Sequence, residues 1–152
     1  MIRLSRKTLL ALEAVIDIAY NARPEPVQAK EITERQGVPQ RYLEQVMQQL
    51  VRAGILKGVR GPRGGYRLAR ERRRISVGDV VRIAMSLDMP EEQFEGGSDL
   101  GRRVVVPIIA GLQEEVMKKL DEISIEEICR RARNAGLDYG AGEGSEATDF
   151  AI

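Results

Sequence analysis

Histidine and tryptophan are absent from this 152-residue chain, and cysteine occurs only once, as Cys129. Without histidine, serine–histidine and cysteine–histidine catalysis are excluded, and the commonest metal ligand is missing. A single cysteine excludes an intramolecular disulfide. No apolar run is long enough to span a membrane. Glu13 and Asp17 interrupt the apolar part of the basic N-terminus, which indicates an amphipathic helix in a cytoplasmic protein rather than a signal peptide.

The net charge of +1 conceals an uneven distribution of charge along the chain. Residues 1–75 contain 16 Lys and Arg against 7 Asp and Glu, whereas residues 76–152 contain 8 against 16. The first part is therefore strongly positive and the second strongly negative. Such asymmetry indicates a polyanion-binding half joined to a half with another role, and uneven but solvated surface charge is the alternative.

Three helices are predicted in the positive half. The first covers residues 5–21, with Ser5 as its N-cap, and its apolar side chains occupy most of the circumference, which is typical of a central helix. The second covers residues 28–36 and is closed by Gly37. The third covers residues 39–53, where one apolar stripe lies opposite a polar face.

A basic β-hairpin follows, with strand formers at 55–59 and 66–69 around the turn of "VRGPRGGYRLAR". The turn lacks the lysine and hydroxyl of a P-loop, and it lies between two strands, unlike a dinucleotide-binding loop. Its glycines permit a tight turn, and its arginines suit DNA phosphates or the minor groove. The order of elements predicts a winged helix-turn-helix DNA-binding domain over residues 1–75, with residues 59–67 as the wing.

DNA contacts are predicted from the polar face of helix 39–53, placed in the major groove, and from the wing. Glutamine and arginine side chains can bond base edges, and a glutamate can accept from cytosine N4. A merely solvated helix face is the alternative. The predicted residues are Gln40, Arg41, Tyr42, Glu44, Gln45, Gln48, Arg60, Gly61, Pro62, Arg63, Gly64, Gly65, Tyr66 and Arg67.

Residues 76–133 are expected to form dimerisation or sensor helices, with an acidic loop at 86–101. Capping boxes at Ser76 and Ser124 each open a helix, and a long helix whose regular part begins near Pro107 lies between them. The acidic tail over residues 134–152 is expected to be disordered. The fold class is therefore mostly α with a small hairpin wing, plus a long C-terminal dimerisation helix whose seam is predicted at Val105, Ile109, Leu112, Val116 and Leu120.

The segments "LSRKTLLALEAVIDIA", "ITERQGVPQRYLEQVMQQLVRAGIL", "VRGPRGGYRLA" and "ISVGDVV" resemble the Rrf-type (IscR-like) winged-helix transcription regulators, over about residues 3–132. The resemblance implies a homodimer in which the long helices of the two subunits pair. It also implies that Glu44 reads a base and that Arg60 is the wing arginine. By the same resemblance, the start of the first helix lies near DNA phosphates, with Arg3, Ser5, Arg6 and Lys7.

The family's iron–sulfur ligands are missing. Cluster-binding members of this family carry three cysteines in the loop before the long helix and a nearby histidine, but loop 86–101 has no cysteine, and Arg103 and Val106 stand at two of the ligand positions. Because iron needs thiolates or imidazoles, no cofactor and no metal site are predicted. Cys129 is a candidate redox residue, with a small buried apolar residue as the alternative.

The favoured function is a sequence-specific DNA-binding transcriptional regulator, a repressor that acts as a homodimer on a pseudo-palindromic operator. The resemblance places it in a sulfur, iron–sulfur or redox response, with an effector protein or small molecule as signal and no membrane partner. The alternative is a winged-helix interaction adaptor without sequence-specific DNA binding. An enzyme is not expected, because no nucleophile–base pair, metal set or phosphate motif is present.

Overall fold

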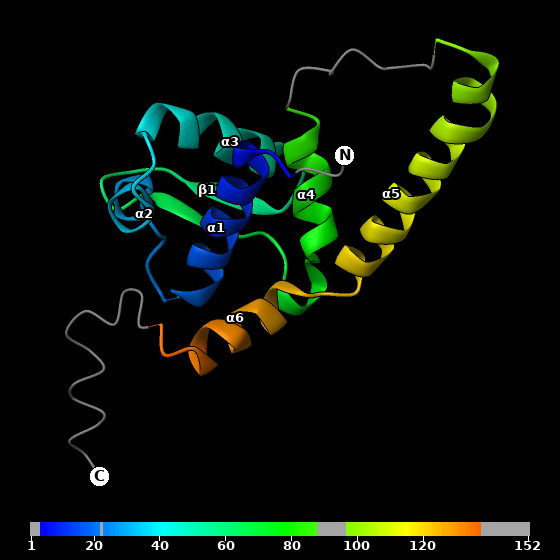
Figure 1. Ribbon diagram of the computed structural model, residues 1–152. Coiled ribbons are helices and arrows are strands. Elements are labelled where there is room, and N and C mark those ends of the chain that lie inside the picture. Colours follow the sequence, from blue (N-terminus) through cyan, green and yellow to red (C-terminus); the bar gives the residue numbers. More distant parts are fainter. Residues whose placement is uncertain (1–3, 22, 88–96, 138–152) are drawn as a thin grey trace.

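A computed structural model describes residues 4–21, 23–87 and 97–137 (Figure 1). It is mostly helical with one two-stranded antiparallel sheet, as predicted. In these ranges no helix has the length and apolar character needed to cross a bilayer. The elements are α1 (Arg6–Tyr20), α2 (Ala29–Gln36), α3 (Gln40–Arg52), β1 (Leu56–Val59), β2 (Gly65–Leu68), α4 (Val77–Met85), α5 (Val106–Asp121) and α6 (Ile125–Asn134).

Local signals in the sequence set most helix ends. The Ser5 hydroxyl accepts a hydrogen bond from the Thr8 N–H at 3.2 Å, and it thereby caps α1. Gly37 adopts a φ of 66°, which stops α2 in a conformation that favours glycine. The capping box at Ser76 is confirmed, whereas at Ser124 only half of the predicted box forms, because the Ser124 hydroxyl accepts from the Glu127 N–H without the reciprocal bond from the Glu127 side chain. These caps satisfy backbone donors that would otherwise lack partners at the helix ends.

α1 is the central helix, with α4, α6 and the hairpin around it (Figure 1). Ala11, Val15 and Ile18 are buried on α1, and the apolar stripe of α3 is buried as well. The prediction of a central first helix is thus confirmed. The side chains of α3 that join this core are Leu43, Val46, Met47 and Leu50.

A buried ion pair fixes α2 against α1. Asp17 is 2% exposed, and its carboxylate accepts hydrogen bonds from Arg35 Nε at 2.8 Å and Nη2 at 2.6 Å. Gln36 Nε2 donates to the same carboxylate at 2.9 Å. The hydrogen bond to Asp17 raises the pKa of Arg35 above its usual value. The two helices before α3 are therefore joined by charge-assisted hydrogen bonds as well as by apolar packing.

The hairpin is held near its turn by the segment that follows α1. The Tyr66 N–H donates to the Val27 carbonyl at 2.8 Å, and the Val27 N–H donates to the Tyr66 carbonyl at 3.0 Å. A Cβ at position 65 would lie 2.4 Å from the Val27 oxygen, so only glycine permits this approach. The wing is thus fixed to the body of the domain by a third extended segment.

α5 projects from the body, and α6 returns to pack against α1 (Figure 1). The start of α4 packs closely against the end of α5, because a Cβ at Gly78 would lie 2.0 Å from Asp121 Oδ1. Arg82 donates to both carboxylate oxygens of Asp121, at 2.5 and 2.6 Å, and this lowers the pKa of Asp121. The base of α5 is therefore firmly joined to the domain while the rest of the helix extends away.

Three features differ from the sequence prediction. One π-helical turn over Gly101–Val105 precedes α5, so helical structure begins before Pro107. Arg72–Arg74 form a 3-10 turn that no sequence signal indicated. Order continues beyond 133, since Leu137 accepts a hydrogen bond from the Tyr20 hydroxyl. Most of the predicted acidic loop, residues 88–96, and most of the predicted tail, residues 138–152, lie outside the described residues.

Candidate nucleic-acid interface

The polar face of α3 points away from the core. Its members are exposed, and Gln40 Nε2 donates a hydrogen bond to Glu44 Oε1 at 3.1 Å. This bond holds the carboxylate of Glu44 on the surface of the helix rather than leaving it free to rotate. Because their side chains are exposed, the donors and acceptors of this face are available to a partner. The exposed residues of the predicted set on α3 are Gln40, Arg41, Glu44, Gln45 and Gln48.

The start of α1 lies beside the start of α3. Lys7 Nζ is 5.8 Å from the centre of the Tyr42 ring, a distance typical of a cation–π contact. Tyr42 is half-buried, so its ring supports Lys7 rather than projecting freely. Ser5 is engaged as the cap of α1, whereas Arg6 is exposed. Arg3 lies outside the described residues.

The wing presents two free cations. Arg60 and Arg63 are exposed, and neither forms an ion pair within the part of the chain that the structure describes. Gly61 has a φ of 112°, and the Gly64 N–H donates to its carbonyl at 2.9 Å. A Cβ on Gly64 would lie 2.3 Å from the Val59 oxygen, so the turn requires glycine there. The tight turn thus displays both arginines at the tip, next to exposed Pro62.

A groove of about 440 Å³ separates the wing from the first turns of α2 and α3. Arg60, Tyr66, Gln40 and Lys30 are among its lining residues. Burial, and secondarily the negative charge of Glu44, raises the pKa of Tyr66, so its hydroxyl remains a neutral donor at neutral pH. Of the predicted residues, Gln40 of α3 and several wing residues, Arg60 and Tyr66 among them, therefore line one groove. Lys30 was missed from the sequence, because only the fold brings α2 to the groove.

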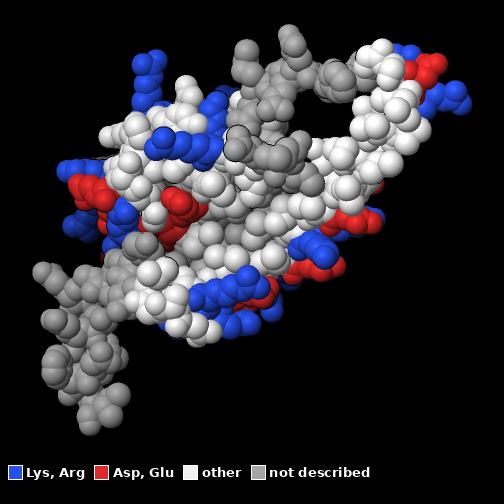
Figure 2. Space-filling view, in the orientation of Figure 1, with Lys and Arg blue, Asp and Glu red and all other residues white. Residues whose placement is uncertain are grey.

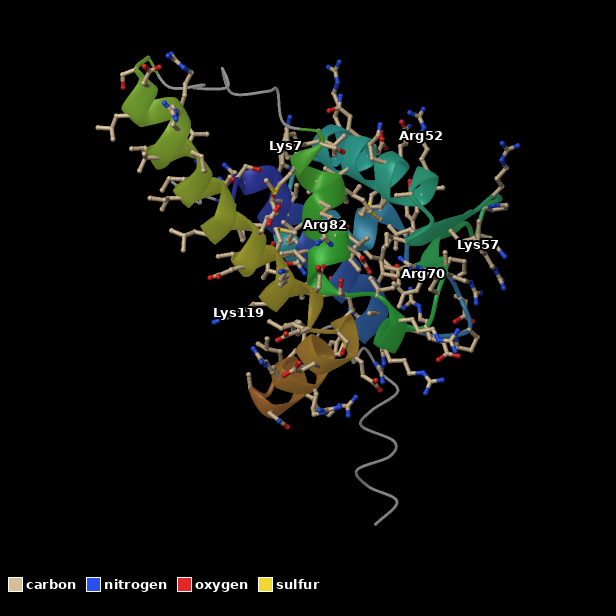
Figure 3. All side chains as sticks on the ribbon, turned by 90° about the vertical axis from the view of Figure 1, so that its right-hand side faces the viewer. Lys7, Arg52, Lys57, Arg70, Arg82 and Lys119 are labelled. Carbon is tan, nitrogen blue, oxygen red and sulfur yellow. The ribbon has the colours of Figure 1, made fainter. Side chains whose placement is uncertain are left out.

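Arg67, predicted to contact DNA, forms a contact within the domain and is still exposed. Its Nη2 donates to the Pro24 carbonyl, so the side chain braces the base of the wing. Lys57 lies opposite Arg67 in the strand register and is exposed. Figure 3 shows Lys57 and Arg70 on the hairpin side of the molecule and Lys119 on the far side, on α5. Lys57 is thus a further exposed cation of the hairpin, one that the sequence pattern did not indicate.

The described residues do not fit an iron–sulfur cluster. Within them, no three histidine, cysteine, aspartate or glutamate side chains gather where a metal ion could bind. Cys129 is 1% exposed, and burial raises the pKa of its thiol despite the nearby Arg72. A thiol sensor needs exposure and a lowered pKa, and Cys129 has neither. Cys129 therefore packs as a small apolar residue of the core.

Comparison with known proteins gives consistent similarities. Residues 4–131 match the family model described as Rrf2, iron-dependent transcriptional regulator. The HTH-type transcriptional regulator IscR of Xenorhabdus nematophila is 35% identical over 130 residues, which are 84% of this chain and 79% of that protein. The solved structure of T. potens IscR has a TM-score of 0.72 at 33% identity and covers 91% of this chain and 94% of its own. CymR, the global cysteine regulator of B. subtilis, has a TM-score of 0.67 at 29% identity and covers 86% and 98%.

Proposed function

This chain belongs to the Rrf2 family and is a DNA-binding transcriptional regulator rather than an enzyme, and from that premise we propose that it acts as a homodimer on a pseudo-palindromic operator. α3 enters the major groove, and the wing lies on the backbone or in the minor groove. The observation that carries this proposal is the groove that Gln40 of α3 and Arg60 of the wing line together, with the other polar side chains of α3 and Arg63 exposed as well. The proposed location is the cytoplasm, in keeping with a role on DNA.

The exposed apolar side of α5 supports the dimer. Ile108 is 57% exposed and Leu112 48% exposed, and Figure 2 shows a largely uncharged surface along this helix. Of the predicted seam, Val105, Ile109 and Leu112 are exposed, whereas Val116 and Leu120 are half-buried, and Leu120 packs against the core. A two-fold pairing of α5 would cover the exposed side chains and set two recognition helices about 34 Å apart, one turn of DNA.

A dimer seated over an operator blocks the polymerase, so repression is the proposed outcome. With no cluster ligands in the described residues, the signal is an effector protein or a small molecule, within the sulfur, iron–sulfur or redox responses that the family resemblance implies. Cys129 is set aside as the sensor because it is buried. The adaptor alternative predicts no preference among DNA sequences, which separates it from this proposal.

Replacing Arg60 and Arg63 together by alanine is expected to weaken binding to every duplex to a similar extent. Each lost phosphate contact lowers the slope of log K against log salt by about 0.9, so four arginines in a dimer lower it by about 3 to 4. The measurement is fluorescence anisotropy of a labelled duplex between about 50 and 200 mM salt.

Lys118→Ala with Lys119→Ala is the matched control, because it removes the same charge from α5, away from the wing (Figure 3). The control is expected to leave the slope nearly unchanged. An equal decrease in both variants would show that net charge alone governs binding and would contradict the role of the wing.

Glu44→Ala is expected to abolish discrimination at one base pair in each half-site, a loss of about 1–3 kcal/mol for the preferred base. Gln40→Ala is expected to cause a smaller loss at the same base pair, because there the side chain of Gln40 acts by holding the carboxylate of Glu44 in place. The measurement is competition among single-base variants of an operator selected from random duplexes. Arg52→Ala, at the exposed last residue of α3, is the control, and a loss of specificity there as well would contradict the assignment.

A further inference from the structure

The described chain ends close to the hairpin. The Tyr20 hydroxyl at the end of α1 donates to the Leu137 carbonyl, which fixes the last described residue beside that helix. Val27, seven positions after Tyr20, pairs directly with Tyr66 of β2. Seven residues span at most about 25 Å, and the Tyr20 side chain adds less than about 10 Å, so Leu137 lies within about 35 Å of the hairpin. In Figure 1 this end lies on the side of the molecule to which the hairpin turn points.

The segment that follows Leu137 is complementary in charge to the wing. Residues 138–152 contain four acidic side chains and no lysine or arginine. These fifteen residues reach up to about 50 Å, which exceeds the upper bound on the distance to the hairpin. Arg60, Arg63 and Lys57 form no ion pair within the described ranges, so the positive surface lacks a partner in this part of the molecule. The acidic side chains are Asp138, Glu143, Glu146 and Asp149.

We propose that residues 138–152 occupy the wing surface of Arg60, Arg63 and Lys57 when DNA is absent, so that the acidic tail of the protein competes with the DNA backbone. This inference rests on the proposed function, since it concerns the same arginines. A tethered segment acts at an effective concentration in the millimolar range, which allows weak contacts to matter. Exposed ion pairs are individually weak, so duplex DNA, with its dense row of phosphates, displaces the tail.

The tail therefore lowers affinity for all DNA, and it lowers it most for short or non-specific duplexes. An operator keeps its base contacts in addition to the backbone contacts, so the competition increases the preference for the operator over other DNA. Both competitors act through charge, and the competition weakens as salt screens the tail from the arginines.

The test neutralises the tail of the full chain with Glu143→Gln, Glu146→Gln and Asp149→Asn. The dissociation constant for a random duplex, measured by anisotropy, is expected to fall by about fivefold at about 50 mM salt and to approach that of the unmodified protein at about 300 mM. The matched control is Glu114→Gln, Glu115→Gln and Glu122→Gln, which changes the net charge equally at exposed positions at and just beyond α5. The control is expected to change the dissociation constant by less than about twofold.

The same tail substitutions are then made in the Arg60→Ala and Arg63→Ala background, where the gain in affinity is expected to disappear. A gain that persists without these arginines overturns docking on the wing. The inference is overturned if the tail variant and the unmodified protein have equal dissociation constants. It is also overturned if the tail and control variants gain affinity equally. Both outcomes leave the proposed function standing. Absence of DNA binding by every variant overturns the proposed function and this inference with it.

Discussion

Asp17→Ala is expected to lower the free energy of unfolding by about 3 kcal/mol, the lower end of the range for removal of one partner from a buried ion pair. The substitution leaves the guanidinium of Arg35 without its carboxylate, and Gln36 loses its acceptor as well. Arg35 retains 18% side-chain exposure, so water compensates part of the loss. Thermal and denaturant unfolding of the variant give the measurement.

Glu13→Ala is the matched control, because Glu13 is an exposed acid on the same helix. Its expected effect stays within about 0.5 kcal/mol. A double substitution, Asp17→Ala with Arg35→Leu, is expected to recover part of the lost stability, because it removes the unpaired charge. Equal stability of the Asp17 and Glu13 variants would show that the ion pair contributes nothing beyond ordinary surface charge.

The sequence predicted the elements whose ends depend on local chemistry. Ser5 and Ser76 accept from backbone N–H groups three positions later, and Gly37 needs only its own φ. The hairpin follows from strand formers around a glycine–proline turn, and its strands start or end within one residue of the predicted positions. Each of these signals depends only on residues that are close in the sequence. The folded chain therefore keeps the helix and strand ends that they predict.

Contacts between residues far apart in the sequence could not be predicted from it. Asp17 looked like an interruption of an apolar helix, and only folding brings Arg35, eighteen positions away, to its carboxylate. Arg67 looked like its neighbours in the basic loop, yet its guanidinium reaches the Pro24 carbonyl. The same limit hid Lys30 and Lys57 from the predicted surface. Composition indicates that a surface is basic, whereas tertiary contacts decide which of its cations are free.

The apolar stripe of α5 has two parts, one packed against the core and one exposed. Its spacing predicted a continuous seam, but Leu120 lies where Arg82 and Asp121 hold the base of α5 against α4, and it joins the core. Toward the N-terminal end the helix leaves the body, and Ile109 and Leu112 remain exposed. The proposed dimer contact is therefore confined to the projecting half of the helix.

Leu112→Glu is expected to convert the proposed dimer into a monomer. In a two-fold interface each substitution occurs twice, and burying an unpaired polar or charged group costs about 2 kcal/mol or more at each copy. The dimer dissociation constant should therefore rise by at least about 1,000-fold. Sedimentation equilibrium over a range of protein concentrations measures this shift directly. Affinity for a two-half-site operator should fall with it, because each monomer then binds a half-site alone.

Ala110→Glu is the matched control on the same helix. Position 110 is exposed and lies about 200° around the helix from position 112, so an equal charge is introduced on the opposite side. This variant is expected to remain dimeric and to bind the operator normally, and circular dichroism should show equal helix content in both variants. If Leu112→Glu stays dimeric at low micromolar concentration, α5 does not pair through this face. The exposed apolar side of α5 would then be a surface for a different partner.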